Sequence, residues 1–319
     1  MNKIGIFLLK ALRKINTKVI RSKPYECECE QDPDKASQLI IDALEGDKPF
    51  MIARFGSTEL ACLMNYIGVK NEKNQFLGFV LGKTNPWWWD NNKIIQMQRW
   101  SGFFPPTVDK IEQFCELMIA DTAQVDILGS WLPDELYFKE QMKNTKKVKL
   151  DFLNPFFSNV PWTIALQGKK VLVVHPFSKT IESQYKKRKL LFENNLLPDF
   201  ELKTIKAVQS IAGEKTKFAD WFEALEYMKV EIDKIDYDIC LIACGAYGFP
   251  LAAHVKRMGK KSFHIGGGLQ LLFGISGKRW EKENFNNSYN YNLMNEYWVK
   301  PDKDETPQNA DIVEGGCYW

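Results

Sequence analysis

Residues 236–268 read DYDICLIACGAYGFPLAAHVKRMGKKSFHIGGG and contain two short apolar runs that each end in glycine. The runs ICLIA and SFHI have the length of strands, and the segment between them has the length and composition of a helix. A strand, a glycine turn, a helix and a second strand form a unit whose two strands lie parallel. This stretch therefore predicts a parallel sheet with glycine turns at the carboxyl ends of its strands.

The same alternation of strand and helix recurs through the rest of the chain. Apolar runs followed by helical patterns span residues 49–68, 168–193 and 200–235. We therefore predict an α/β, Rossmann-like fold with a mainly parallel sheet and helices on both faces. Residues 24–285 form the single predicted domain, between a basic N-terminal helix in residues 1–23 and an aromatic-rich C-terminal extension in residues 286–319.

The composition is that of an ordinary globular protein. The 319 residues are 45% hydrophobic and 26% charged, and 43 Lys and Arg against 40 Asp and Glu leave a net charge of +3, which does not indicate a nucleic-acid partner. Seven cysteines without the spacing of a zinc site or a disulfide framework predict reduced, structural thiols. We expect a cytoplasmic protein.

The N-terminal region has seven Lys and Arg and no acidic residue before Glu26. Its apolar residues share one side of a helix, which is typical of a helix on an anionic membrane surface and also of one that packs on its own domain with a solvated basic face. The apolar run IGIFLL is too short to span a bilayer, and no cleavage site follows it. The inner face of the membrane is therefore one expected location.

In an open parallel sheet, ligands bind beyond the carboxyl ends of the strands. The residues that the predicted strands place there are polar or small: Arg54, Gly56, Ser57, Glu59, Asp134, Glu135, His175, Ser178, Gly245, Ala246, Tyr247, Gly248, Gly266, Gly267 and Gly268. We expect these side chains and turns to meet at one edge of the sheet.

The turn GAYG, with the helix that follows it, is the candidate phosphate site. Gly245 and Gly248 allow the backbone to come close to a ligand, and a helix that begins there directs free N–H groups at it. The glycines from Gly266 onward are expected to leave room for a nucleotide. The chain lacks GxGxxG with an acidic residue after it, so a dehydrogenase is disfavoured.

Arg54 and Glu59 have two interpretations. An arginine at a strand end suits a diphosphate, whereas a salt bridge between the two residues would be structural. Glu59 is a candidate catalytic residue that binds a metal ion, orients the sugar or acts as base on the acceptor hydroxyl. His175 is a candidate acid, base or ligand contact, or a hydrogen-bonded structural residue.

Aromatic residues form two further candidate surfaces. Trp87, Trp88 and Trp89 are either a platform for an acceptor sugar or a cap on the core. The C-terminal aromatics Tyr289, Tyr291, Tyr297 and Trp298 are expected to help shape the acceptor site.

The segments RFGSTEL, VVHPF and IACGAYGFPLAAHVKRMGKKSFHIGGG together resemble the GT-D class of bacterial glycosyltransferases, over roughly residues 35–280. LQLLFGISGKRW and the closing EGGCYW are similar to proteins of capsule and exopolysaccharide clusters. The resemblance implies transfer of a sugar from a nucleotide diphosphate donor, with a UDP-sugar favoured, to a cell-surface glycan or lipid-linked glycan. Together with the positions at the strand ends, the resemblance assigns the diphosphate contacts to the following residues: Arg54, Gly56, Ser57, Gly245, Ala246, Tyr247, Gly248, Gly266 and Gly267. Ser178, at the helix start after VVHPF, is assigned to the same site from its position alone.

The chain departs from that class at its metal motif. Where the class has Asp-x-Glu, this chain has Ser57, Thr58 and Glu59. A divalent metal, Mn²⁺ or Mg²⁺, is then expected only if Asp134 or Glu135 replaces the missing carboxylate. A phosphohydrolase or sugar-phosphate transferase on the same scaffold, and a non-catalytic assembly factor for glycans, remain as alternatives.

Overall fold

The computed structural model describes residues 3–19, 25–71, 75–281 and 293–319. A seven-stranded sheet forms the centre of the molecule, in the order β3-β2-β1-β7-β6-β4-β5, and every pair of neighbouring strands is parallel. The strands are β1 (Phe50–Ala53), β2 (Ile127–Ser130), β3 (Lys146–Lys149), β4 (Lys170–His175), β5 (Glu201–Lys206), β6 (Ile239–Ile242) and β7 (Lys261–His264). The predicted α/β, Rossmann-like fold is confirmed.

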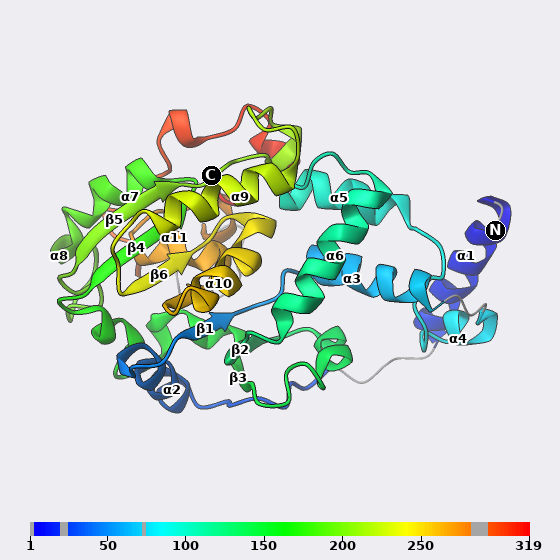
Figure 1. Ribbon diagram of the computed structural model, residues 1–319, viewed down its shortest axis with the longest axis horizontal. Helices are drawn as coiled ribbons and strands as arrows, with labels where there is room; N and C mark the ends of the chain where they lie inside the picture. Colours follow the sequence, from blue (N-terminus) through cyan, green and yellow to red (C-terminus); the bar gives the residue numbers. More distant parts are fainter. Residues whose placement is uncertain (1–2, 20–24, 72–74, 282–292) are drawn as a thin grey trace.

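Helices cover both faces of this sheet (Figure 1). One layer contains α3 (Ser57–Lys70), α5 (Asn91–Ser101), α6 (Val108–Thr122), α9 (Trp221–Asp233) and α10 (Gly248–Arg257). The other layer contains α2 (Pro33–Glu45), α7 (Ser178–Tyr185), α8 (Arg188–Leu191) and α11 (Leu269–Leu272).

Successive residues of a strand point into different layers. In β4, Leu172 and Val174 belong to the core under the first layer, whereas Val171 and Val173 belong to the core under the second. Because side chains alternate along a strand and both faces are covered, apolar residues are favoured at every position of a central strand. This is why β1, β4 and β6 appear in the sequence as mostly apolar runs.

The N-terminal helix α1 (Lys3–Val19) packs beside the short helix α4 (Phe76–Val80), at the end of the molecule farthest from β5 (Figure 1). Leu9 is buried against Phe79 and Trp88. Two basic residues of α1 are bound to the domain, since Lys10 Nζ lies 2.7 Å from Asp90 and an Arg13 guanidinium nitrogen lies 3.3 Å from a backbone oxygen. Part of the basic side therefore faces the protein, which neither interpretation of the sequence anticipated.

The order of the strands fixes where polar residues gather. Strands β1 to β3 run outward to one edge of the sheet, and β4 to β7 fill the other side, with β7 returning beside β1. Ligand crevices of open parallel sheets lie where the strand order reverses in this way. Within the described residues, no helix is long and apolar enough to cross a bilayer.

Gly248 allows the first turn of α10 to pack on the ring of His264 in β7. A Cβ at position 248 would lie 2.3 Å from the Cε1 atom of His264. We expect Gly248→Ala to lower the free energy of unfolding by about 1–3 kcal/mol, as overpacking does, and we expect His264→Ala to remove that penalty in the double variant. Urea titrations of the four proteins test this, and equal penalties in both backgrounds would contradict the contact.

Candidate functional site

A cavity of about 450 Å³ lies at the carboxyl ends of the central strands β1, β7, β6 and β4. Most residues that the sequence assigned to this edge line it: Arg54, Gly56, Ser57, Glu59, His175, Gly245, Ala246, Tyr247, Gly266 and Gly267. The C-terminal segment also lines the cavity, through Glu314, Tyr318 and Trp319. The structure thus brings ten of the fifteen predicted residues together and adds a wall from the end of the chain; Asp134, Glu135, Ser178, Gly248 and Gly268 do not line the cavity.

Arg54 and Glu59 lie in this cavity without binding each other. Among the described residues, neither takes part in an ion pair, so the structural salt bridge is not observed. One guanidinium nitrogen of Arg54 donates to the carbonyl oxygen of Phe55 at 3.1 Å. The buried Nε atom of Arg54 has no hydrogen-bond partner in the described part of the chain. A buried donor without a partner is costly, which indicates a place for an acceptor.

The carboxylate of Glu59 lies against Gly56 at the start of α3. A Cβ at position 56 would come within 1.8 Å of Glu59 Oε2. Glu59 is the third residue of α3, where a carboxylate interacts favourably with the helix dipole. Since it lines the cavity as well, it is available both to the helix and to a ligand.

The turn between β6 and α10 packs closely against other parts of the chain. Gly245 has a φ of +58°, which favours glycine, and a Cβ there would lie 3.1 Å from the carbonyl oxygen of Ser101. The ring of Tyr247 stacks on Trp221 with ring centroids 4.9 Å apart, and its hydroxyl lies 3.0 Å from the hydroxyl of Ser210. The turn is therefore rigid beside the cavity.

The glycines after β7 have a different role from the predicted one. A Cβ would lie 3.0 Å from Arg54 Nε at Gly266, 2.5 Å from the ring of Tyr318 at Gly267, and 2.3 Å from the amide oxygen of Asn154 at Gly268. Glycine is needed at these positions because other side chains of the protein occupy the space that a Cβ would take. The expectation that they leave open room for a nucleotide is wrong for Gly267 and Gly268.

His175 and His264 line the cavity as neutral imidazoles. The Nδ1 atom of His175 accepts a hydrogen bond from the backbone N–H of Phe177 at 2.9 Å, which leaves its Nε2 as the protonated nitrogen. Burial lowers the pKa of His175 to about 3. Burial and the nearby charge of Arg54 lower the pKa of His264 to about 3. His175 therefore suits donation of a hydrogen bond better than proton abstraction at neutral pH.

The helix start after β4 is already occupied by a carboxylate of this chain. Glu305, which is buried, accepts hydrogen bonds from the backbone N–H groups of Lys179 at 2.8 Å and Thr180 at 3.1 Å. Ser178 is the first residue of α7, Phe177 is the N-cap residue, and Ser178 does not line the cavity. The predicted phosphate contact at Ser178 is therefore not supported.

Glu135 and Asp134 lie outside the cavity. The Glu135 carboxylate is fully buried and accepts hydrogen bonds from the Ser130 hydroxyl and from the backbone N–H groups of Trp131 and Leu132. Burial raises the pKa of Glu135, and these hydrogen bonds oppose the rise. Glu135 thus stabilises the turn after β2, and the expectation that it replaces the missing metal ligand is wrong.

The tryptophan triplet packs against neighbouring helices and does not line the cavity. Trp87 and Trp88 pack edge to face with Phe79 of α4, at centroid distances of 6.1 and 5.0 Å, and Trp89 packs on Tyr66. Of the two interpretations of the sequence, the structure favours the core cap. Of the C-terminal aromatics, Tyr289 and Tyr291 lie outside the described residues, and Tyr297 and Trp298 do not line the cavity.

The cavity residues that the sequence did not predict include Trp100, Trp131, His264, Arg279, Glu314, Tyr318 and Trp319. Trp131 directly follows β2, so the rule that ligands bind at strand ends could have identified it. Arg279 and Trp319 lie outside the strands, and no local pattern connects them to the sheet.

No family model, no curated protein and no solved structure matches the chain.

The two cavity histidines predict a specific loss of stability in mild acid. The unfolded chain binds protons near pH 6.5, whereas the folded chain keeps both rings neutral down to about pH 3. The free energy of unfolding should therefore fall as the pH drops through this window, by up to about 1.4 kcal/mol per pH unit for each histidine. Denaturant titrations from pH 7 to 4 measure this slope. It should be shallower in His175→Asn and His264→Asn, and an unchanged slope in both variants would contradict the assignment.

Proposed function

We propose that the protein is a glycosyltransferase that takes a nucleotide diphosphate sugar as donor and transfers the sugar to a glycan acceptor. One observation carries the proposal. An arginine and a carboxylate, Arg54 and Glu59, lie together in a cavity at the carboxyl edge of a parallel sheet, and neither has an ion-pair partner among the described residues.

The shape of the cavity supports a ligand of this size. Its volume of about 450 Å³ is within the range of small-molecule sites. Trp100 and Trp131 contribute to its lining, and their side chains are 37% and 38% exposed. Flat aromatic surface of this kind suits stacking on a base or a sugar ring.

In this proposal the chain stabilises the leaving group. The diphosphate gains negative charge as the glycosidic bond breaks, and a preorganised cation at that position lowers the barrier. Arg54 is held by the carbonyl of Phe55 and keeps its buried Nε free to donate. His175 donates from Nε2, and the carboxylate of Glu59 accepts a hydrogen bond from a sugar hydroxyl.

The cavity does not fit a metal ion held by the protein alone. Among the described lining residues, Glu59 is the only carboxylate without an ion pair, because Glu314 is bound to Arg279. The described ranges also contain no cluster of three or more His, Cys, Asp or Glu side chains that could hold a metal ion. We therefore assign no catalytic step to a metal and include Mn²⁺ and Mg²⁺ as variables in the experiment.

The first test is thermal unfolding against UDP, GDP, dTDP and their sugar derivatives, with and without Mn²⁺ or Mg²⁺. A ligand that binds only the folded state raises the melting temperature by mass action. We expect at least one nucleoside diphosphate to raise it in the wild type. Arg54→Gln should reduce this shift, since it removes a charge-assisted contact worth about 1.5–3 kcal/mol.

The carboxylates provide a matched pair of variants. Glu59→Gln should leave the unliganded melting temperature nearly unchanged and reduce sugar transfer, because an amide oxygen is a weaker acceptor than a carboxylate, whereas Glu135→Gln should lower the melting temperature. Hydrolysis of phosphomonoesters without sugar transfer would favour the phosphohydrolase. Full transfer activity in Glu59→Gln would overturn the role of Glu59, and no response to any nucleotide would overturn the donor site.

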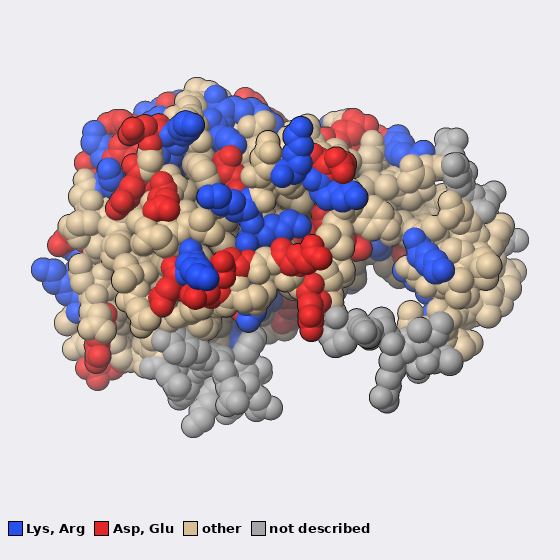
Figure 2. Space-filling model, turned by 90° about the horizontal axis from the view of Figure 1, so that it is seen from below, with Lys and Arg blue, Asp and Glu red and all other residues tan. Residues whose placement is uncertain are grey.

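We further propose that the enzyme works at an anionic membrane surface, where lipid-linked acceptors are found. Exposed apolar side chains on the packed helices α1 and α4 form what we call the α1–α4 patch: Ile4, Phe7, Leu8, Leu12, Ile15, Phe76 and Leu77. Phe7 and Leu77 are each 71% exposed. Figure 2 shows mainly uncharged and basic residues on the visible face of this end. The basic first 23 residues supply the complementary charge.

Sedimentation with vesicles tests this location. The protein should bind vesicles of phosphatidylcholine that contain phosphatidylglycerol, and Phe7→Ser with Leu77→Ser should weaken that binding. Leu190→Ser is the control, because Leu190 is also exposed but lies on α8. Equal binding by the patch variant and the control would contradict the proposal.

A further inference from the structure

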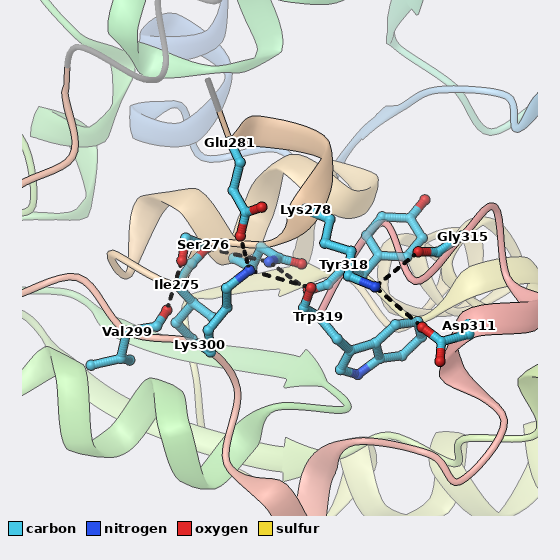
Figure 3. Close-up of polar contacts among 11 residues, drawn as sticks. Ile275, Ser276, Lys278, Glu281, Val299, Lys300, Asp311, Gly315, Tyr318 and Trp319 are labelled. Carbon is cyan, nitrogen blue, oxygen red and sulfur yellow. Dashed lines mark hydrogen bonds and ion pairs between the residues drawn. The ribbon is translucent and has the colours of Figure 1, made fainter. Parts of the chain in front are cut away.

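The last six residues of the chain, Glu314 to Trp319, close one side of the cavity. Figure 3 shows two lysines that hold this segment. Lys278 Nζ contacts Asp311 at 3.2 Å and the carbonyl oxygen of Gly315 at 3.3 Å. Lys300 Nζ lies 3.4 Å from the carbonyl oxygen of Trp319. The end of the chain is therefore a docked part of the site.

A second arginine, Arg279, lines the cavity and contacts this segment. The Arg279 guanidinium lies 4.8 Å from the ring centroid of Tyr318, and its Nη1 lies 3.3 Å from the Tyr318 hydroxyl. The same ring packs against Gly267, and the neighbouring Gly266 packs against Arg54 Nε. Tyr318 thus contacts Arg279 directly and reaches the glycines beside Arg54.

The polar groups of these residues are unevenly satisfied. Arg279 forms an ion pair with Glu314. By contrast, the buried Nε of Arg54 and the buried Nε1 of Trp319 have no hydrogen-bond partner among the residues described. The cavity is thus lined by two donors without a partner and by one arginine that is paired with a carboxylate of the same chain. An anion with several acceptor oxygens would complete this set.

The backbone at Glu314 has an unusual conformation. Glu314 has a φ of +47°, and Gly315 and Gly316 follow with φ values of +72° and +81°. A glutamate rarely adopts the left-handed region, so surrounding contacts must hold it there. The ion pair with Arg279 is one such contact, and a competing anion would release it.

We propose that Arg279 is a second contact for the donor diphosphate, and that Glu314 occupies this contact until the donor replaces it. This inference rests on the proposed function, because it assigns a further residue to the same donor site. On binding, the diphosphate displaces the Glu314 carboxylate from Arg279 and satisfies the free donors of Arg54 and Trp319. No covalent bond changes in this exchange.

Calorimetric titration with UDP, GDP and dTDP tests the exchange, using the diphosphate that binds the wild type most tightly. Arg279→Gln should weaken binding at least tenfold, and Arg279→Lys should weaken it less. Glu314→Gln should tighten binding about threefold to fivefold, because a partly exposed ion pair contributes up to about 1 kcal/mol. In the double variant, Glu314→Gln should have no further effect.

Asp311→Asn is the matched control. It removes a contact of Lys278 in the same part of the chain and leaves Arg279 unchanged, so its affinity should equal that of the wild type. If the wild type binds a diphosphate and Glu314→Gln binds it with equal or lower affinity, the exchange is overturned and the proposed function stands. Unchanged affinity in Arg279→Gln would overturn both the Arg279 contact and the exchange, and would leave the proposed function standing. Absence of binding by the wild type would overturn both proposals.

Discussion

Burial of the parallel sheet on both faces is the constraint on which this structure depends. With α3 and α10 in one layer and α2 and α7 in the other, the central strands are buried on both faces, and a polar side chain within them, such as Ser262 of β7, is bound to the backbone of the chain itself. Polar residues that act on a ligand can gather only beyond the strand ends. Arg54 and His175 lie there because each stands at the end of such a strand, and this position places them at the cavity.

Local pattern was sufficient to predict the fold and much of the rim. The runs that form β4 and β6 are mostly apolar, and glycines follow β6 and β7, so strand, turn and helix could be placed without knowledge of contacts. Most residues assigned to strand ends then line the cavity, because parallel strands end at the same edge.

Predictions from the sequence failed where contacts between distant parts of the chain decide the role of a residue. Gly267 and Gly268 are small because Tyr318 and Asn154 approach them, and both approaching residues are distant in sequence or belong to another loop. The position of Glu135 in the sequence suggested a metal ligand. Its carboxylate instead accepts hydrogen bonds from the backbone of the turn after β2. Arg279 enters the site from an irregular segment. None of these contacts leaves a periodic signal in the sequence.

We propose Arg54 as the centre of an anion site, and a crystal structure with a bound nucleoside diphosphate tests this most directly. We predict a phosphate oxygen within about 3 Å of the Arg54 guanidinium, in the cavity between Glu59 and the C-terminal segment. A nucleotide bound elsewhere, or an Arg54 side chain that pairs with Glu59 and leaves the phosphates without contact, would contradict the account.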